Sequence, residues 1–157
     1  MADTEPFELK GADGKLIRGD RLDGEGRQIL FVTGFLSKRW GNKSRALAQW
    51  CGERTWGFCC FDFRGNGDSE GDFKDYTLCN WLEDAWAVVR MLDQGPPLTI
   101  VGSSLGGWLA WPCCHEASQD MVFEGMNCGG IREASVYSTM AVPTPVTKSV
   151  TRTMIAV

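Results

Sequence analysis

The sequence predicts an α/β protein built on a doubly wound, mostly parallel sheet. Short apolar runs, typical of buried strands, alternate with longer stretches whose apolar residues recur at spacings of three and four, typical of helices. One apolar run also leads directly into the small-residue segment Gly102–Gly106, and a helix-forming stretch follows it. Strand and helix therefore alternate, as a parallel sheet covered on both faces requires.

The first third of the chain is expected to form strands. Residues 7–10 and 16–19 flank Asp13-Gly14, a turn signal, so they predict a hairpin. The mainly apolar residues 28–32 predict a central parallel strand that is covered on both faces.

Two helices and a buried strand are expected in the middle of the chain. After an irregular segment over residues 33–41, a helix is predicted around residues 44–53 and a strand over residues 56–61. A polar, glycine-rich loop covers residues 62–69, and a second helix covers about residues 78–92. This second helix has one apolar stripe, made of Leu78, Trp81, Leu82, Ala85, Trp86, Val89 and Leu92.

Ser104 is the candidate nucleophile. It lies in Gly102-Ser103-Ser104-Leu105-Gly106, a G-x-S-x-G pattern placed directly after the predicted strand at residues 98–101. Such a serine sits on a strained turn, and a Cβ at Gly102 or Gly106 would collide with the adjoining strand or helix. The amide of Leu105 opens the next helix and can point at a developing oxyanion. A dinucleotide-binding fingerprint fits less well, because it requires glycine where Ser104 stands.

Four segments, in order, resemble the α/β-hydrolase family. Residues 31–35 resemble its strand and oxyanion loop, and residues 62–69 are similar to its D-x-R-G-x-G-x-S loop. The long helix and the elbow follow, and the elbow at residues 101–109 looks most like abhydrolase-domain esterases and thioesterases, in the branch of the mitochondrial palmitoyl-protein thioesterase. The resemblance covers about residues 5–111.

The resemblance implies a serine esterase or thioesterase that works through an acyl-enzyme on Ser104. The backbone amides of Phe35 and Leu105 would form its oxyanion hole. Small-molecule or acyl-protein esters and thioesters are the implied substrates, and no cofactor or metal is expected.

The chain is expected to divide into a partial hydrolase domain, residues 5–111, and a divergent or irregular tail, residues 112–157. Pro112 is predicted to break the helix after the elbow, and residues 121–123 and 134–137 are weak strand candidates. Three further strand–helix units of about 30 residues each do not fit in the remaining length. The sheet is therefore expected to be incomplete at the C-terminus, as in a truncated, alternatively spliced or frameshifted product, although a divergent but functional tail is the alternative.

No residue is assigned as the general base or the acid. His115 is the only histidine, and along a helix it would lie about 16 Å from Ser104, whereas a base must come within hydrogen-bond reach. Asp120, Glu124 and Glu133 are no better placed as the acid. The chain is therefore predicted to have little or no turnover.

A non-catalytic role is the alternative, as a truncated fragment or a pseudoenzyme that binds acyl ligands or a partner. A sheet that ends at its elbow strand would leave unpaired amides along one edge, which invites self-association.

Charge and composition exclude several classes. A net charge of -4 and a pI near 5.0 argue against nucleic-acid binding. No apolar stretch is long enough to span a membrane. The acidic start resembles neither a signal nor a transit peptide, which favours the cytoplasm, whereas the family resemblance leaves the mitochondrion open. The 7 cysteines form no C-x-x-C pair and are expected to be reduced and mostly buried, not zinc ligands.

Several conspicuous side chains are given structural roles. Asp62 and Arg64 are expected to hold their loop together by hydrogen bonds. Among the tryptophans, packing is expected for Trp50, Trp56, Trp81 and Trp86, whereas Trp40 and Trp108 are the two that could approach a site.

Overall fold

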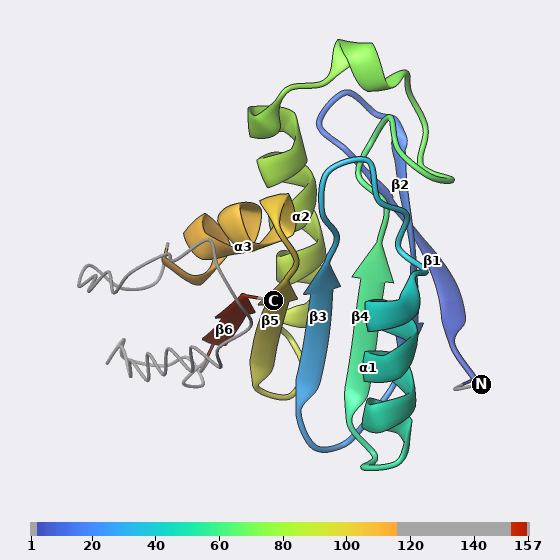
Figure 1. Ribbon diagram of the computed structural model, residues 1–157, viewed down its shortest axis with the longest axis vertical. Helices are drawn as coiled ribbons and strands as arrows, with labels where there is room; N and C mark the ends of the chain where they lie inside the picture. Colours follow the sequence, from blue (N-terminus) through green and yellow to red (C-terminus); the bar gives the residue numbers. More distant parts are fainter. Residues whose placement is uncertain (1–2, 116–151, 157) are drawn as a thin grey trace.

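The computed structural model describes residues 3–115 and 152–156, which form a six-stranded sheet with helices on both faces (Figure 1). The strand order across the sheet is β1-β2-β4-β3-β5-β6. The strands are β1 (Glu5–Lys10), β2 (Leu16–Leu22), β3 (Gln28–Val32), β4 (Gly57–Phe61), β5 (Leu98–Gly102) and β6 (Arg152–Ala156). The first two form the predicted hairpin, and β2 also pairs antiparallel with β4. The other four strands are parallel, which confirms the predicted fold class.

The helices cover the two faces of the sheet. On one face lies α1 (Asn42–Gly52), and on the other lie α2 (Leu78–Leu92) and α3 (Leu105–His115) (Figure 1). A short 3-10 turn, η1 (Phe73–Asp75), precedes α2. Within the described part of the chain, no helix is long and apolar enough to cross a membrane.

Alternating residues of the central strands fill two separate cores. In β3, Leu30 and Val32 belong to the cluster that includes residues of α2 and α3. Ile29 and Phe31 point the other way and pack with residues of α1. This alternation follows from the period of two along a strand. It explains why every residue of β3 is buried and why the run looks continuously apolar in the sequence.

The prediction that Pro112 ends the helix after the elbow is wrong. Helix α3 continues through Pro112 to His115. Proline removes one helical hydrogen bond and costs about 3 kcal/mol in a helix interior. Leu109, Ala110 and Cys113 are buried in the core on either side of it, and this burial offsets the cost. The division of the chain at residue 111 stays a prediction.

The expectation that the elbow strand forms the edge of the sheet is also wrong. β5 pairs in parallel with β6, in a register that places Leu98 opposite Arg152 and Gly102 opposite Ala156. Self-association stays a prediction, but an open edge at β5 no longer supports it. The weak strand candidates at residues 121–123 and 134–137 lie outside the described residues.

Candidate active site

Ser104 lies on the turn between β5 and α3, at the carboxyl end of the parallel strands. Its φ is 53°, in the left-handed region that non-glycine residues rarely adopt. The Ser103 N–H donates to the Val32 carbonyl at 3.0 Å and the Gly106 N–H donates to the Ser103 carbonyl at 2.9 Å, so the turn is held tightly against β3. The Ser104 residue is exposed, so its hydroxyl is accessible to a substrate.

The two glycines of the turn are required by close packing, as predicted. A Cβ on Gly102 would lie 2.4 Å from Gly107 Cα in α3. A Cβ on Gly106 would lie 2.2 Å from the carbonyl oxygen of Val32 in β3. Real Cβ atoms do not approach backbone this closely, so each position admits only glycine without a backbone shift.

The loop after β3 brings a second tight turn to Ser104. The Ser37 N–H donates to the Gly34 carbonyl at 3.2 Å, and Leu36, the third residue of this turn, has a φ of 53°. That sign is the one a type II turn requires at this place. A Cβ on Gly34 would lie 3.4 Å from Ser104 Cβ, so the loop backbone faces the serine directly.

Two backbone donors next to Ser104 are free. Among the described residues, the amides of Phe35 and Leu105 donate no hydrogen bond to a backbone or side-chain acceptor. Leu105 is the first residue of α3, where the N–H groups have no partner within the helix. The structure thus places free N–H groups on both segments that flank the serine, the loop after β3 and the start of α3.

Arg39 anchors the loop after β3. Its backbone N–H donates to Asp62 Oδ1 at 2.6 Å, and its guanidinium contacts Asp62 Oδ2 at 2.5 Å, Asp20 at 2.6 Å and Asp68 at 2.7 Å. Burial alone would lower the pKa of Arg39, but the hydrogen bonds from these carboxylates outweigh it and raise the pKa above its ordinary value. The loop that carries Phe35 is therefore tied to the glycine-rich loop after β4.

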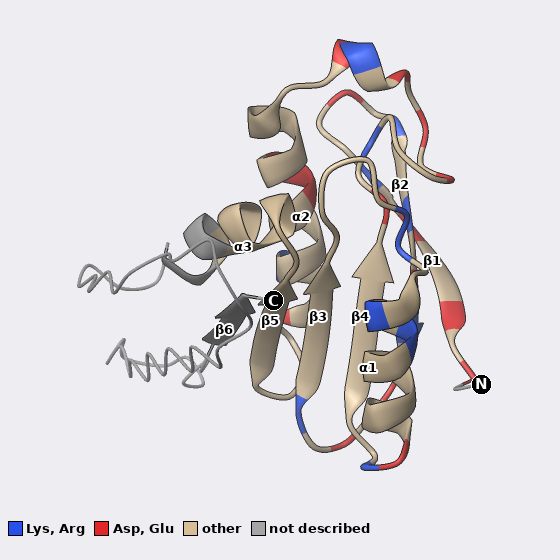
Figure 2. Cartoon of the chain, in the orientation of Figure 1, with Lys and Arg blue, Asp and Glu red and all other residues tan. Residues whose placement is uncertain are grey.

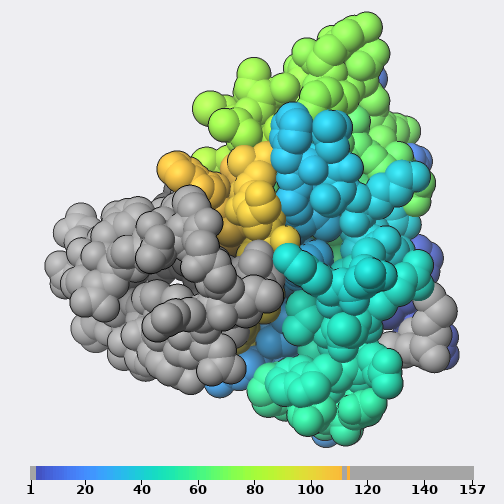
Figure 3. All heavy atoms as spheres, viewed as in Figure 1, coloured from blue at the N-terminus to red at the C-terminus, as the bar shows by residue number. Residues whose placement is uncertain are grey.

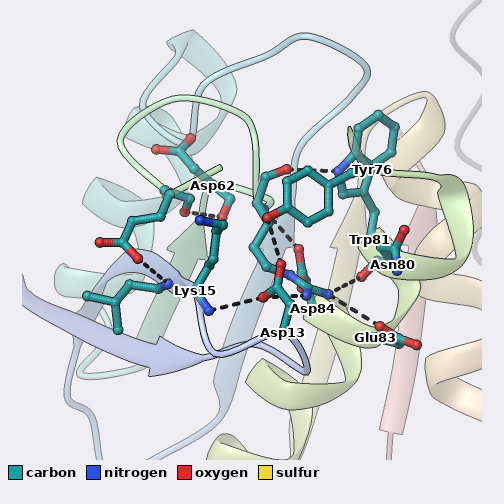
Figure 4. Close-up of polar contacts among 12 residues, drawn as sticks. Asp13, Lys15, Asp62, Tyr76, Asn80, Trp81, Glu83 and Asp84 are labelled. Atoms are coloured by element: carbon teal, nitrogen blue, oxygen red, sulfur yellow. Dashed lines mark hydrogen bonds and ion pairs between the residues drawn. The ribbon is translucent and has the colours of Figure 1, made fainter. Parts of the chain in front are cut away.

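Arg64 organises a second buried network (Figure 4). Its guanidinium donates to Asp84 at 2.5 Å and pairs with Asp13 at 2.9 Å and Glu83 at 3.3 Å, and it also lies over the ring of Tyr76. Burial raises the pKa of Asp84 to about 6, against the opposing effect of its hydrogen bonds from Arg64. Arg64 is only 1% exposed, which agrees with the structural role expected for it and for Asp62.

Three large apolar side chains are exposed on the two segments that flank Ser104, the loop after β3 and the start of α3. Phe35 is 56% exposed, Leu36 64% and Trp108 67%, although the Phe35 ring also makes edge contacts with Phe73 and Trp81. Trp108 is the fourth residue of α3, four positions after Ser104 in the chain. On the face shown in Figure 3, the loop after β3 (blue) lies against the start of α3 (yellow to orange).

The sequence-based assignments of the tryptophans hold only in part, whereas the described cysteines are mostly buried, as predicted: Cys51, Cys59, Cys60 and Cys113 are buried and Cys79 is exposed. Trp81 is buried as predicted, whereas Trp50 is 39% exposed although its ring contacts that of Trp56. The indole N–H of Trp40 donates to Asp20 at 2.7 Å. Burial raises the pKa of the Cys51 thiol to about 11 and that of Cys59 well above its ordinary value, so neither thiol competes as a nucleophile.

The structure does not bring a histidine to Ser104 within the residues it describes. His115 ends α3, and Ser104 precedes its first residue, so the length of the helix separates the two backbones. The acid candidates Asp120, Glu124 and Glu133 lie outside the described residues.

Sequence reasoning missed three residues at or behind the site. Arg39 and Asp84 are charged residues of ordinary appearance, and only the fold brings each beside its partners. Lys43, in the first turn of α1, donates from Nζ to Ser103 Oγ at 3.0 Å. No pattern in the sequence marked it, because it lies 60 residues from its partner.

A family model described as the alpha/beta hydrolase fold matches residues 28–124 of the chain. A curated bovine protein named mitochondrial palmitoyl-protein thioesterase ABHD10 is 33% identical over 102 residues, which cover 65% of this chain and 33% of that protein. The human protein of the same name is 38% identical over 91 residues, or 57% of this chain and 29% of that protein. The chain thus spans about a third of the length of these relatives.

Solved structures show the same likeness. Mouse alpha/beta hydrolase domain-containing protein 10 superposes with a TM-score of 0.66 and 31% identity, over 70% of this chain and 44% of that one. A hydrolase described as putative from Agrobacterium vitis superposes with a TM-score of 0.66 and 27% identity, over 75% of this chain and 47% of that one. A Pyrococcus furiosus esterase, at 22% identity and a TM-score of 0.64, covers 73% of this chain and 47% of its own, and shares the fold alone.

Proposed function

Because this chain belongs to the α/β hydrolase family, we propose that it carries the nucleophile of an ester- or thioester-cleaving site, and that the nucleophile is Ser104. The observation that carries the proposal is the backbone of Ser104. Ser104 has a φ of 53° and is exposed to solvent. It lies between Gly102 and Gly106, where only glycine fits without a backbone shift. Strained backbone of this kind clusters at active sites, and here it coincides with the G-x-S-x-G pattern.

In the proposed reaction, Ser104 Oγ attacks the acyl carbonyl carbon. The new bond gives a tetrahedral oxyanion, and its collapse expels the alcohol or thiol and leaves an acyl-enzyme, which water then hydrolyses. The free amides of Phe35 and Leu105 would stabilise the oxyanion, and each donor is worth about 3 kcal/mol in such sites. The anchored loop supports this role, since Arg39 fixes the segment that carries Phe35.

The proton of Ser104 requires a base, and none is assigned. His115, the only histidine, sits at the far end of α3. Loss of the other triad members costs a serine protease about 10⁶ in rate. We therefore expect the 157-residue chain by itself to turn over little or no substrate.

The proposed substrates are acyl esters or thioesters of a small molecule or a protein. The curated relatives are named palmitoyl-protein thioesterases, and the exposed Phe35, Leu36 and Trp108 offer apolar surface next to the serine. These exposed side chains favour a substrate with an apolar acyl chain, but they do not define the length of that chain.

The test is hydrolysis of p-nitrophenyl butyrate and of the matching butyryl thioester by the purified chain and by its Ser104→Ala variant. We expect rates for the chain close to those of the variant. Robust hydrolysis that disappears in Ser104→Ala would support Ser104 as the nucleophile, but it would refute the expectation that the chain has no base to activate it. Robust hydrolysis that persists in Ser104→Ala would refute Ser104 itself.

A non-catalytic binding role remains a second proposal, but the open sheet edge that motivated it is not at β5. The compartment is also a proposal, between the cytoplasm and the mitochondrion, for which the relatives are named. A C-terminal fluorescent fusion, imaged against a mitochondrial marker, decides between the two compartments.

A further inference from the structure

Lys43 is a cation that contacts Ser103, the residue before the candidate nucleophile. It is the second residue of α1, and its Nζ donates to Ser103 Oγ at 3.0 Å. Consecutive Cα atoms lie about 3.8 Å apart, so the ammonium is within about 12 Å of the Ser104 hydroxyl whatever its rotamer. Figure 3 shows the start of α1 (teal) reaching the same face as the start of α3.

Within the described residues, Lys43 has no carboxylate partner. No ion pair joins it to an acidic side chain, and its one hydrogen bond goes to a neutral hydroxyl. The carboxylates of Asp20, Asp62 and Asp68 on the neighbouring loops and strand are paired with Arg39. The charge of Lys43 is therefore available to a ligand.

The position of Lys43 does not serve the helix that carries it. A positive charge in the first turn opposes the helix dipole, which favours acidic residues there by about 0.3–1 kcal/mol. The first turn of α1 holds no acidic residue, and Figure 2 shows only Lys and Arg as charged residues in this part of α1. Helix stability thus gives no reason for a lysine at this position.

We infer that Lys43 is a specificity-determining residue, which selects substrates that carry an anionic group, such as a carboxylate, a few bonds from the scissile carbonyl. The ammonium would exchange the Ser103 hydroxyl for the anion, a stronger, charge-assisted hydrogen bond. This inference rests on the proposed function, because it takes Ser104 as the reacting residue. The anion can belong to the acyl chain or to the leaving group.

The experiment is an NMR titration of the full chain, followed at the backbone amides of Ser103, Ser104 and Leu105. Glutarate against glutaramide represents an anionic acyl chain, and 3-hydroxypropanoate against its amide represents an anionic leaving group. The variants are Lys43→Gln, which removes the charge, and Lys43→Arg, which keeps it. Lys74→Gln is the matched control, since Lys74 is an exposed lysine on η1 that pairs with Asp72.

We expect the acid of at least one pair to bind about fivefold more tightly than its amide, the ratio that 1 kcal/mol of charge interaction gives. Lys43→Gln should abolish this preference, whereas Lys43→Arg and Lys74→Gln should keep it, and the responding pair identifies the side of the substrate. Equal binding of acid and amide in both pairs, or an unchanged preference in Lys43→Gln, overturns the inference. Loss of the preference in Lys43→Arg also overturns it, because the charge alone would then not explain the role of Lys43.

The titration does not depend on turnover. It can be repeated in Ser104→Ala, where the anion preference should persist. A failure of the proposed function would appear as Ser104-independent ester cleavage, with the titration result unaffected.

Discussion

Gly106 and Val32 approach so closely that a Cβ on Gly106 would lie 2.2 Å from the Val32 carbonyl oxygen. This contact joins the first turn of α3 to the end of β3 and fixes the turn that carries Ser104. The glycine is therefore needed for geometry, whatever the chemistry of the serine.

Gly106→Ala should lower the free energy of unfolding by about 3 kcal/mol, because the obstructing atoms are backbone and cannot rotate away. Chemical denaturation measures the change. Gly41→Ala is the control, since a Cβ on Gly41 meets nothing within 4 Å and should cost about 1 kcal/mol, through the poorer fit of alanine at the N-cap of α1. Equal effects of the two substitutions would contradict the packing account.

Ser104→Gly should raise the free energy of unfolding by about 1 kcal/mol, because glycine adopts a positive φ without strain. Thr55 also has a positive φ, of 54°, and is exposed on a remote loop, so Thr55→Gly should stabilise the protein similarly. Only Ser104→Gly should abolish reaction with a serine-directed probe. A destabilised Ser104→Gly variant would mean that the serine side chain contributes to folding.

Arg39→Met should destabilise the protein by about 3 kcal/mol, because it leaves the buried carboxylate of Asp62 without its cation. Arg39→Lys should recover little of this loss, since a single ammonium cannot bridge three carboxylates. A double-mutant cycle with Asp62→Asn measures the coupling, which we expect to be about 2 kcal/mol. Additive effects of the two substitutions would show that the pair does not anchor the loop.

Asp13 should contribute to acid sensitivity. Partial burial raises the pKa of its carboxyl, but the Lys15 amide, the Tyr76 hydroxyl and Arg64 outweigh this and lower the pKa from 3.8 to about 2. The stabilisation is therefore present above about pH 4 and is lost as the pH falls toward 2. Unfolding free energies measured across this range should fall less steeply in Asp13→Asn than in the unmodified protein, and Tyr76→Phe should lie between them. Parallel curves for all three proteins would contradict the assignment.

The described sheet and helices were largely predictable from the sequence. The bounds of α2 match the prediction at both ends, because its apolar stripe and the flanking polar segments define it locally. The steric roles of Gly102 and Gly106 were also predictable, since a serine between a strand and a helix leaves little room around it. The bounds of α2 and the contact of Gly102 with Gly107 depend on residues close together in the chain, whereas Gly106 meets Val32 of β3.

The contacts that support the site were not predictable. Arg39 meets Asp20, Asp62 and Asp68 only after β2, β3 and β4 have paired. The pairing of β6 with β5, and the continuation of α3 through Pro112, likewise depend on tertiary packing, which overrides local preference. Lys43 belongs to the same class, because its contact with Ser103 exists only in the folded protein.

The central proposal, that Ser104 is a positioned nucleophile with no base beside it among the described residues, is tested most directly by its rate of phosphonylation. The purified chain and Ser104→Ala are treated with a fluorophosphonate, with and without added imidazole, and the adduct is followed by intact mass. We predict slow labelling of the chain, a marked acceleration when imidazole supplies the missing base, and no adduct in Ser104→Ala. Fast labelling without imidazole would contradict the absence of a base, and no labelling under either condition would contradict the role of Ser104.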